Sequence, residues 1–189
     1  MNTLFIDTHG EVVVLAIYTD EKLMKKKESK ERKDHSTICM PLLVELLTES
    51  KLDIKDINDI VVVNGPGSFT GVRIGVTIAK TLAFTLNIPI RMITSLELYL
   101  DTIQNQEYLV LNEKNGYYIG KIENKQIIEY EYIKTSEFDS WALNKNIVFG
   151  DKINYENLIV FAHQKEETNP HVVNPFYVKK IEVENDKRS

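Results

Sequence analysis

The chain has 189 residues, which is enough for one ordinary domain or for two small lobes. A hydrophobic share of 43% allows a buried core, while a net charge of −5 argues against a protein that binds nucleic acid alone through a broad basic face. The single cysteine, Cys39, cannot form an internal disulfide, which suits a reducing compartment. The longest apolar run near the start, residues 12–18, is too short for an ordinary signal peptide or a membrane span, so we expect a cytoplasmic protein without membrane contact.

Apolar periodicity in the first half predicts a sheet with helices on its faces. Strands are expected over 2–7, 12–19 and 22–29, followed by a helix over 37–50, a strand over 59–64, a helix over 70–86 and a strand over 90–93. Three consecutive strands joined by short turns, and then alternating helices and strands, indicate a mixed sheet.

The second half repeats this order more loosely. We expect a helix over 96–104, strands over 108–111, 116–122 and 127–133, a helix over 136–144 with Ser136 as its cap, and strands over 147–150 and 158–162. The sequence therefore predicts an α/β protein of two lobes, residues 1–95 and 96–189.

The loop 64–75, with the sequence NGPGSFTGVRIG, joins a predicted strand to a predicted helix. Gly65 and Gly67 allow close approach of backbone to backbone, and Ser68 and Thr70 lie where a helix N-cap belongs. Such a loop can hold a phosphate at the helix N-terminus, or it can be a rigid corner that directs the helix. It lacks the lysine of a Walker loop and is one residue too long for a dinucleotide fingerprint, so a structural turn is the commoner outcome.

Within this loop, G-P-G-S-F-T-G-x-R-x-G closely resembles the signature of the bacterial TsaB (YeaZ) family. The segments 5–8 (F-I-D-T), 35–47 (H-S, then P-L-L and E-L-L) and 175–179 (P-F-Y-V-K) are also similar to family motifs, the last to a closing strand. The resemblance is good over residues 1–100 and loose over 100–189.

The resemblance implies a two-lobe fold of the actin/Hsp70/sugar-kinase class, with mixed sheets and with a second lobe shortened between residues 162 and 175. It implies a non-catalytic scaffold that binds and activates the transferase TsaD, which makes threonylcarbamoyladenosine in tRNA. The small ATPase TsaE is the other expected partner, and tRNA is met only through the complex. ATP, ADP and metal are expected on the partners, with no cofactor of this chain's own, and a homodimer is expected when the chain is alone.

In this fold, an acid at the first hairpin of each lobe holds the metal for phosphotransfer. Asp7 supplies the first acid, but Asn112 stands where the second would lie, and His9 and Gly10 replace small hydroxyl residues. We therefore expect no catalytic residues and little or no ATPase activity. The candidate nucleotide-binding residues are Asp7, Thr8, Gly65, Gly67, Ser68, Thr70 and Gly71. The alternatives are an independent ATP-dependent kinase, which Asp7→Ala would abolish, and a structural homodimer.

Two other sites are disfavoured by spacing. His35 and Cys39 share a helix face and could hold a soft metal, but no second pair completes a site, so a buried cysteine beside a first-turn histidine is preferred. The G-S-F-T-G string places its serine off the central position that the G-x-S-x-G elbow of a hydrolase requires.

Two helices have surfaces that suit a partner. The segment 36–50 is apolar around roughly two-thirds of its circumference, so it is either covered from outside or fully buried within the chain. The segment 70–86 turns small residues inward and a mixed polar and aromatic face outward. The resemblance implies docking through both helices, and the candidate interface residues are His35, Cys39, Leu43, Leu46, Thr70, Arg73, Thr77, Lys80 and Phe84.

The segment from Lys22 to Lys33 carries seven Lys or Arg residues and two Glu. A solvated sheet edge, where lysines discourage pairing with other chains, is the preferred interpretation. Contact with tRNA inside a larger complex is the alternative, because phosphate contacts need only flexible cations.

Overall fold

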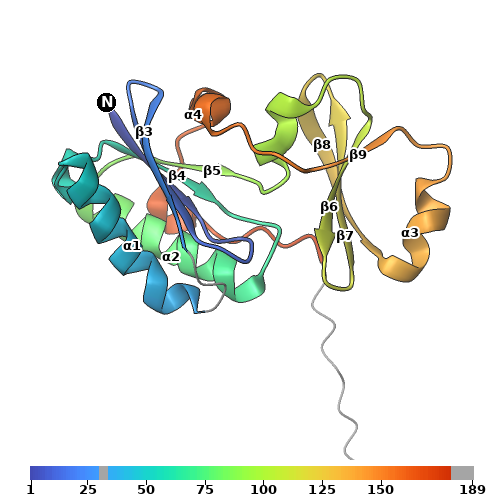
Figure 1. The fold of residues 1–189 in the computed structure, drawn as a ribbon, viewed down its shortest axis with the longest axis horizontal. Helices are drawn as coiled ribbons and strands as arrows, with labels where there is room; N and C mark the ends of the chain where they lie inside the picture. The colour runs from blue at the N-terminus through green and yellow to red at the C-terminus, as the bar shows by residue number, and fades with distance from the viewer. Residues whose placement is uncertain (30–33, 180–189) are drawn as a thin grey trace, which may run out of the picture.

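The computed structural model describes residues 1–29 and 34–179, which form two lobes, each built around its own sheet (Figure 1). The first sheet has the order β3-β2-β1-β4-β5. Its β1, β2 and β3 are antiparallel neighbours, whereas β4 and β5 run parallel to β1. The strands are β1 (Asn2–Asp7), β2 (Val14–Thr19), β3 (Lys22–Glu28), β4 (Asp59–Val63) and β5 (Ile90–Ile93).

The second sheet repeats this arrangement with one strand fewer, in the order β8-β7-β6-β9. Again three antiparallel strands are followed by one that runs parallel to the first of them. The strands are β6 (Tyr108–Glu113), β7 (Gly116–Glu123), β8 (Gln126–Lys134) and β9 (Ile147–Phe149). The predicted α/β class with mixed sheets is confirmed.

The helices divide unequally between the lobes (Figure 1). Helices α1 (His35–Ser50) and α2 (Phe69–Leu86) cover one face of the first sheet, and α4 (Tyr155–His163) covers the other. Helix α3 (Thr135–Ala142) packs on the second sheet. Short 3₁₀ turns complete the fold: η1 (Ile54–Asp56), η2 (Glu97–Thr102) and η3 (Pro170–Val172).

Strands of the first sheet are buried on both faces because helices lie on both. Along β1, Leu4 and Ile6 pack toward α1 and α2, while Phe5 packs toward α4. Along β4, Val62 packs toward α1 and α2, and Val61 packs toward α4. This explains why the sequence there is continuously apolar and does not alternate.

Three sequence predictions are wrong in detail. Residues 158–162 were expected as a strand, but they belong to α4, because Leu158 and Ala162 lie four residues apart on the helix face that meets the sheet. Residues 96–104 form only the 3₁₀ turn η2. Ser136 does not cap α3, whose N-cap is Lys134 without a side-chain hydrogen bond.

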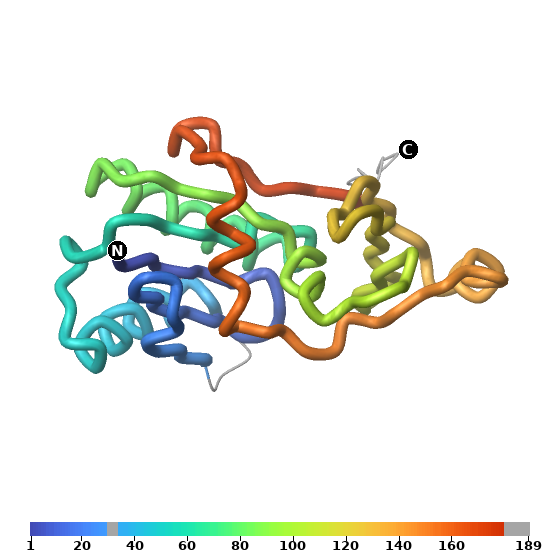
Figure 2. Tube along the Cα trace, turned by 90° about the horizontal axis from the view of Figure 1, so that it is seen from above, coloured from blue at the N-terminus to red at the C-terminus, as the bar shows by residue number. Residues whose placement is uncertain are grey.

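The segment 175–179 was expected as a closing strand, but it joins neither sheet. We call residues 170–179 the strap, because they leave the first lobe beside α2 and run to the second lobe (Figure 2). Phe176 N donates to Asn64 O at 2.7 Å, which is a single backbone bond rather than a ladder.

A buried cluster of charges ties the end of α4 to the first sheet. Asp59, fully buried in β4, pairs with Arg91 of β5, and Arg91 also lies 2.7 Å from Glu167. His163 at the end of α4 lies 3.3 Å from the Asp59 carboxylate and 3.0 Å from that of Glu21. Burial raises the pKa of Asp59, although the neighbouring Arg91 and His163 oppose that shift.

Small residues let α2 approach the first hairpin closely. A Cβ added to Gly75 would lie 2.3 Å from Thr8 Oγ1, and one added to Gly71 would lie 2.2 Å from Thr8 O. The predicted inward stripe of small residues is therefore confirmed. By length and composition α2 could also span a membrane, but in this fold the stripe faces the protein's own sheet and first hairpin.

Candidate functional site

The glycine loop is held in place by its neighbours on three sides. Ser68 is the N-cap of α2 and accepts a hydrogen bond from Gly71 N at 3.2 Å, while Ser68 N donates to His9 O at 2.8 Å. Ser95 donates from its hydroxyl to Pro66 O at 2.6 Å and from its backbone to Gly65 O at 2.9 Å. The loop therefore directs α2 as a rigid corner.

Gly65 is the position where this corner needs glycine. Its φ is +115°, a conformation that other residues rarely adopt. A Cβ there would also lie 2.5 Å from Phe176 O of the strap.

The first hairpin lies directly against this loop, so the fold brings together all the predicted nucleotide-binding residues. Thr8 donates its hydroxyl hydrogen to Gly71 O at 2.6 Å. Asp7 is only 3% exposed, and its Oδ1 accepts from His9 N at 3.0 Å and lies 2.6 Å from His9 Nδ1. Nucleotide binding at these residues remains a prediction, and their polar groups make contacts within the chain.

His9 is the residue that changes the chemistry of this hairpin. Burial alone would lower the pKa of His9, but the adjacent Asp7 charge and the hydrogen bond to it raise the pKa overall. The imidazole therefore engages the carboxylate that a metal would need. Asn112, in the corresponding hairpin of the second lobe, is exposed and carries no charge. No group of three or more His, Cys, Asp or Glu that could hold a metal ion occurs among the described residues.

The outward face of α2 carries the predicted residues Thr70, Arg73 and Thr77, which are exposed. Phe84 on the same helix is 62% exposed, and Lys80 is half-buried. This face is solvent-accessible along the length of the helix.

The strap runs beside this face and contacts it, which the sequence did not predict. Arg73 Nε donates to the Tyr177 hydroxyl at 2.8 Å, and its guanidinium lies 3.8 Å from the centre of the Phe69 ring. Lys80 donates to Val173 O at 3.0 Å. The sequence feature that could have pointed to this contact was the motif at 175–179. Its tyrosine, Tyr177, stacks on Phe69 with ring centres 5.2 Å apart.

Helix α1 divides into a buried side and an apolar exposed side. Cys39, Leu43 and Leu46, expected at a partner interface, lie in the chain's own core, so a partner cannot reach them. The exposed side instead presents Met40 and Val44, the latter 60% exposed.

The predicted pair of His35 and Cys39 does not resemble a metal site. Burial raises the pKa of the Cys39 thiol to about 11. His35 Nε2 lies 3.1 Å from Glu11 O, so the imidazole is engaged by backbone.

The lysines of β3 pair mainly within the chain. Lys25 and Lys27 lie 2.7 and 2.6 Å from the carboxylate oxygens of Glu49 on α1, and Lys27 also pairs with Glu45. Lys26 lies over the ring of Tyr155, 4.1 Å from its centre. These contacts agree with the prediction that β3 forms a solvated sheet edge. Residues 30–33 of the basic segment lie outside the described residues.

The two lobes share the order βββαβα, and with their mixed sheets they define an α/β protein of two related halves. Two solved structures of Pseudomonas aeruginosa proteins share the fold. One, a protein described as similar to peptidase YEAZ, superposes with a TM-score of 0.74 at 18% identity and covers 94% of this chain and 99% of its own. The other, YeaZ, has a TM-score of 0.73 at 16% identity and covers 93% of this chain and 100% of its own.

Sequence comparison finds named relatives over about half of the chain. The TsaB protein of Bacillus subtilis, named for tRNA threonylcarbamoyladenosine biosynthesis, is 42% identical over 97 residues, which are 51% of this chain and 42% of that protein. The Escherichia coli TsaB is 36% identical over 96 residues, 51% of this chain and 41% of its own length. About half of the chain is thus similar to proteins named TsaB, and its fold is shared with a structure named YeaZ.

Two features of these matches bear on function. The matching region spans less than half the length of the curated relatives. The sequence model of the TsaD family, described as tRNA N6-adenosine threonylcarbamoyltransferase, matches residues 24–113. This region contains α1, the glycine loop and α2.

Proposed function

We propose that this chain acts in the biosynthesis of threonylcarbamoyladenosine in tRNA, as a scaffold that binds and activates a TsaD-type transferase. The observation that carries the proposal is the exposed face of α1 and α2. The TsaB relatives, named for this pathway, support the same assignment.

The composition of this face suits a protein interface. Val44, Phe69 and Phe84 are large apolar residues exposed on two helices that lie against the same face of one sheet. Arg73 lies among them with its guanidinium over an aromatic ring. Aromatic residues and arginine are enriched at interfaces and dominate their energetics, whereas isolated monomers keep such patches small.

The hairpin chemistry supports a non-catalytic role for the chain. The Asp7 carboxylate is held by His9, and the second lobe offers Asn112 where phosphotransfer would need an acid. In the proposed complex, the transferase and the small ATPase TsaE bind ATP, ADP and metal, and tRNA is reached only through the assembly. Alone in the cytoplasm, the chain covers the same surface by forming a homodimer.

The test measures complex formation and tRNA modification together. Purified chain is mixed with the TsaD-type transferase of its own genome and analysed by size-exclusion chromatography with light scattering. The double variant Arg73→Glu/Phe84→Asp should abolish the complex. The matched control is Leu143→Asp, an equally exposed apolar site on the second lobe, which should leave the complex intact.

In cells depleted of the chain, mass spectrometry of tRNA nucleosides should show loss of threonylcarbamoyladenosine. Wild type and Leu143→Asp should restore it, and the double variant should not. Unchanged modification in depleted cells would reject the proposal. Turnover of ATP by the chain alone, abolished by Asp7→Ala, would favour a kinase instead.

A further inference from the structure

A pocket of about 460 Å³ lies at one end of the second sheet, where the β6–β7 turn, the start of α3 and the end of the strap meet. We call it the lysine pocket, because its lining consists of three lysines and neutral residues: Lys114, Lys134, Lys179, Asn115, Tyr132, Thr135 and Ser136. Among the described residues no carboxylate lines it, although Glu113, Glu131 and Glu137 are neighbours in sequence. The chain has a net charge of −5, so the pocket reverses the sign of the charge locally.

Strand pairing brings two of the lysines together. Gly116, the first residue of β7, pairs with Lys134, the last residue of β8. Lys134 therefore lies beside the β6–β7 turn, which carries Lys114. The backbone N of Thr135 donates to Asn115 O at 3.2 Å, and this bond ties the start of α3 to the same turn. The two lysines are thus placed by regular backbone structure rather than by a loop of their own.

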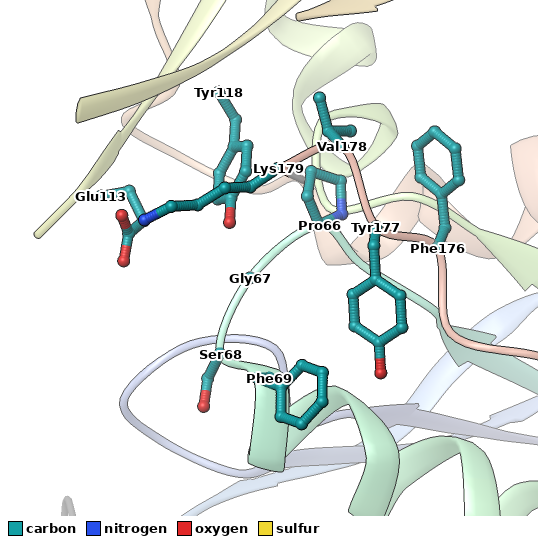
Figure 3. Close-up of a pocket in the computed structure, with 10 residues that line it drawn as sticks. All are labelled: Pro66, Gly67, Ser68, Phe69, Glu113, Tyr118, Phe176, Tyr177, Val178 and Lys179. Atoms are coloured by element: carbon teal, nitrogen blue, oxygen red, sulfur yellow. The ribbon is translucent and has the colours of Figure 1, made fainter. Parts of the chain in front are cut away.

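The third lysine is held by an aromatic ring. The Lys179 ammonium, at the end of the strap, lies over the Tyr132 ring, 4.8 Å from its centre. Gly116 leaves room for this ring, since a Cβ there would lie 2.7 Å from the Tyr132 hydroxyl oxygen. The Lys179 side chain extends toward Glu113 (Figure 3), but neither Lys114 nor Lys179 forms an ion pair within residues 1–29 and 34–179. Both ammonium groups therefore keep hydrogen-bond donors for an anion.

The lysine pocket is distinct from the pocket between the two lobes, in which Tyr118 lies opposite the glycine loop (Figure 3). Lys179 borders both pockets. Gly67 and Ser68, which belong to the predicted nucleotide-binding residues, line only the pocket between the lobes. A ligand of the lysine pocket therefore need not contact the glycine loop.

The composition of the lysine pocket favours an anionic partner over an apolar one. Lysine is depleted at protein interfaces, and of the described residues none of the large exposed apolar side chains lines the pocket. The three lysines are exposed, and the described lining contains no arginine, whose planar fork would fix a carboxylate or phosphate in one geometry. Exposed lysines on flexible stems contact phosphate oxygens and do not read the bases that the phosphates carry.

We propose that the lysine pocket binds the phosphate backbone of RNA. Lysines on three separate segments suit a row of phosphates, whereas a single small anion is better held by a closed concavity of fixed donors. The choice of RNA rests on the proposed function, which places the chain beside a tRNA, while the preference for phosphate rests on the pocket alone. In the proposed assembly, the second lobe contacts the tRNA directly, and α1 and α2 contact the transferase.

The test measures binding of a fluorescent RNA stem-loop to the pure chain by fluorescence anisotropy. Because the net charge of −5 opposes RNA, binding should be weak, and the titration starts at about 50 mM salt. Contact with three phosphates predicts that log K falls against log salt with a slope of about −2 to −3. Lys114→Gln, Lys134→Gln and Lys179→Gln should each weaken binding about two- to fivefold and make the slope shallower by about 1. The matched control is Lys125→Gln in the β7–β8 turn, at the other end of the same sheet, which should change neither value.

Pyrophosphate is the second probe, because it offers the same chemistry without the RNA chain. Competition by pyrophosphate only far above the RNA concentration supports the RNA backbone as the ligand, and tighter binding of pyrophosphate than of RNA would overturn it. The proposal is also overturned if no RNA binds at low salt, or if the three pocket variants weaken binding no more than Lys125→Gln does. Thermal melting followed by circular dichroism checks that each variant is folded.

Failure of this proposal can be told from failure of the scaffold proposal. The triple lysine variant should still form the complex with the transferase, since none of the three lysines lies on α1 or α2. A complex with the transferase, together with RNA binding that does not depend on the lysines, would reject the lysine pocket alone. Lysine-dependent RNA binding without a complex would support the lysine pocket and reject the scaffold role alone.

Discussion

The two lobes follow the same order of elements, but they use the last helix differently. In the first lobe, α2 follows β4 and packs on its own sheet; in the second, α4 follows β9 and packs on the first lobe's sheet, against β3 and β5. Within residues 34–179, the second sheet keeps α3 as the one α-helix packed on it. The comparison teaches that a repeated topology does not fix which core a helix completes, because the apolar face of α4 is buried by the sheet of the other lobe.

The largest effect is expected from truncating a side chain of α4, which tests whether this helix completes the core of the first lobe. Ile159 is fully buried against the first sheet, so Ile159→Ala should cost about 2 to 5 kcal/mol of unfolding free energy. The control is Val160→Ala at the next position, which is exposed and should cost less than about 0.5 kcal/mol. Chemical denaturation monitored by circular dichroism gives both values. Equal, small losses would show that α4 does not complete the first core.

A second prediction concerns the close approach of α2 to the first hairpin. Gly75→Ala should destabilise the protein by about 2 kcal/mol, because the new Cβ would lie 2.3 Å from Thr8 Oγ1. This strain exceeds the roughly 1 kcal/mol that alanine gains over glycine in a helix. Gly10→Ala, with nothing within 4 Å, serves as the control and should be nearly neutral in thermal unfolding. A stabilised Gly75→Ala variant would contradict the packing described for α2.

A third prediction uses the Asp7–His9 pair of the first hairpin, which has no counterpart at Asn112 in the second hairpin. Since the pKa of His9 is raised above 6.5 in the folded state, folding favours the protonated form. The stabilisation from His9 is complete below about pH 6.5 and is lost as the pH rises through the higher folded pKa. The difference in unfolding free energy between wild type and His9→Gln should therefore shrink as the pH is raised. A wild-type advantage that grows with pH would refute the pairing with Asp7.

The smallest predicted effect tests the strap as the link between lobes. Tyr177→Phe removes the hydroxyl that accepts from Arg73 and keeps the ring stacked on Phe69. It should cost about 0.5 to 1 kcal/mol, because the bond is partly exposed. Tyr177→Ala, which also removes the stacking, should cost more in the same urea titration. A loss of several kcal/mol for Tyr177→Phe would mean that the hydroxyl holds more than this one contact.

The strands and helices of the first lobe were largely predictable because their neighbours in sequence are also their neighbours in space. The strand over Ile90–Ile93 was predicted with its observed bounds, and α1 and α2 begin within two residues of their predicted starts. Residues 158–162 were misread because a short apolar run does not distinguish a buried strand from a buried helix turn.

The site was predictable only where local chemistry decides it. Ser68 was recognised as a cap, and Arg73 was correctly placed on the outward face of α2. Burial of Leu43 within the chain could not be read from a helix that is apolar on most sides. The position of Tyr118 opposite the glycine loop depends on how the strap joins the lobes. The periodicity of apolar residues predicts helices and strands but does not predict that arrangement.

Helix α4 also has a consequence for the order in which the protein is synthesised. All five strands of the first sheet have been translated once Ile93 is made, but the helix that covers Phe5 and Val61 begins only at Tyr155. At ordinary rates of translation, this leaves one apolar face of the sheet uncovered for roughly 3 to 12 seconds. During that interval the nascent chain presents a surface that chaperones recognise, so the first lobe to be translated depends on a later segment to become soluble.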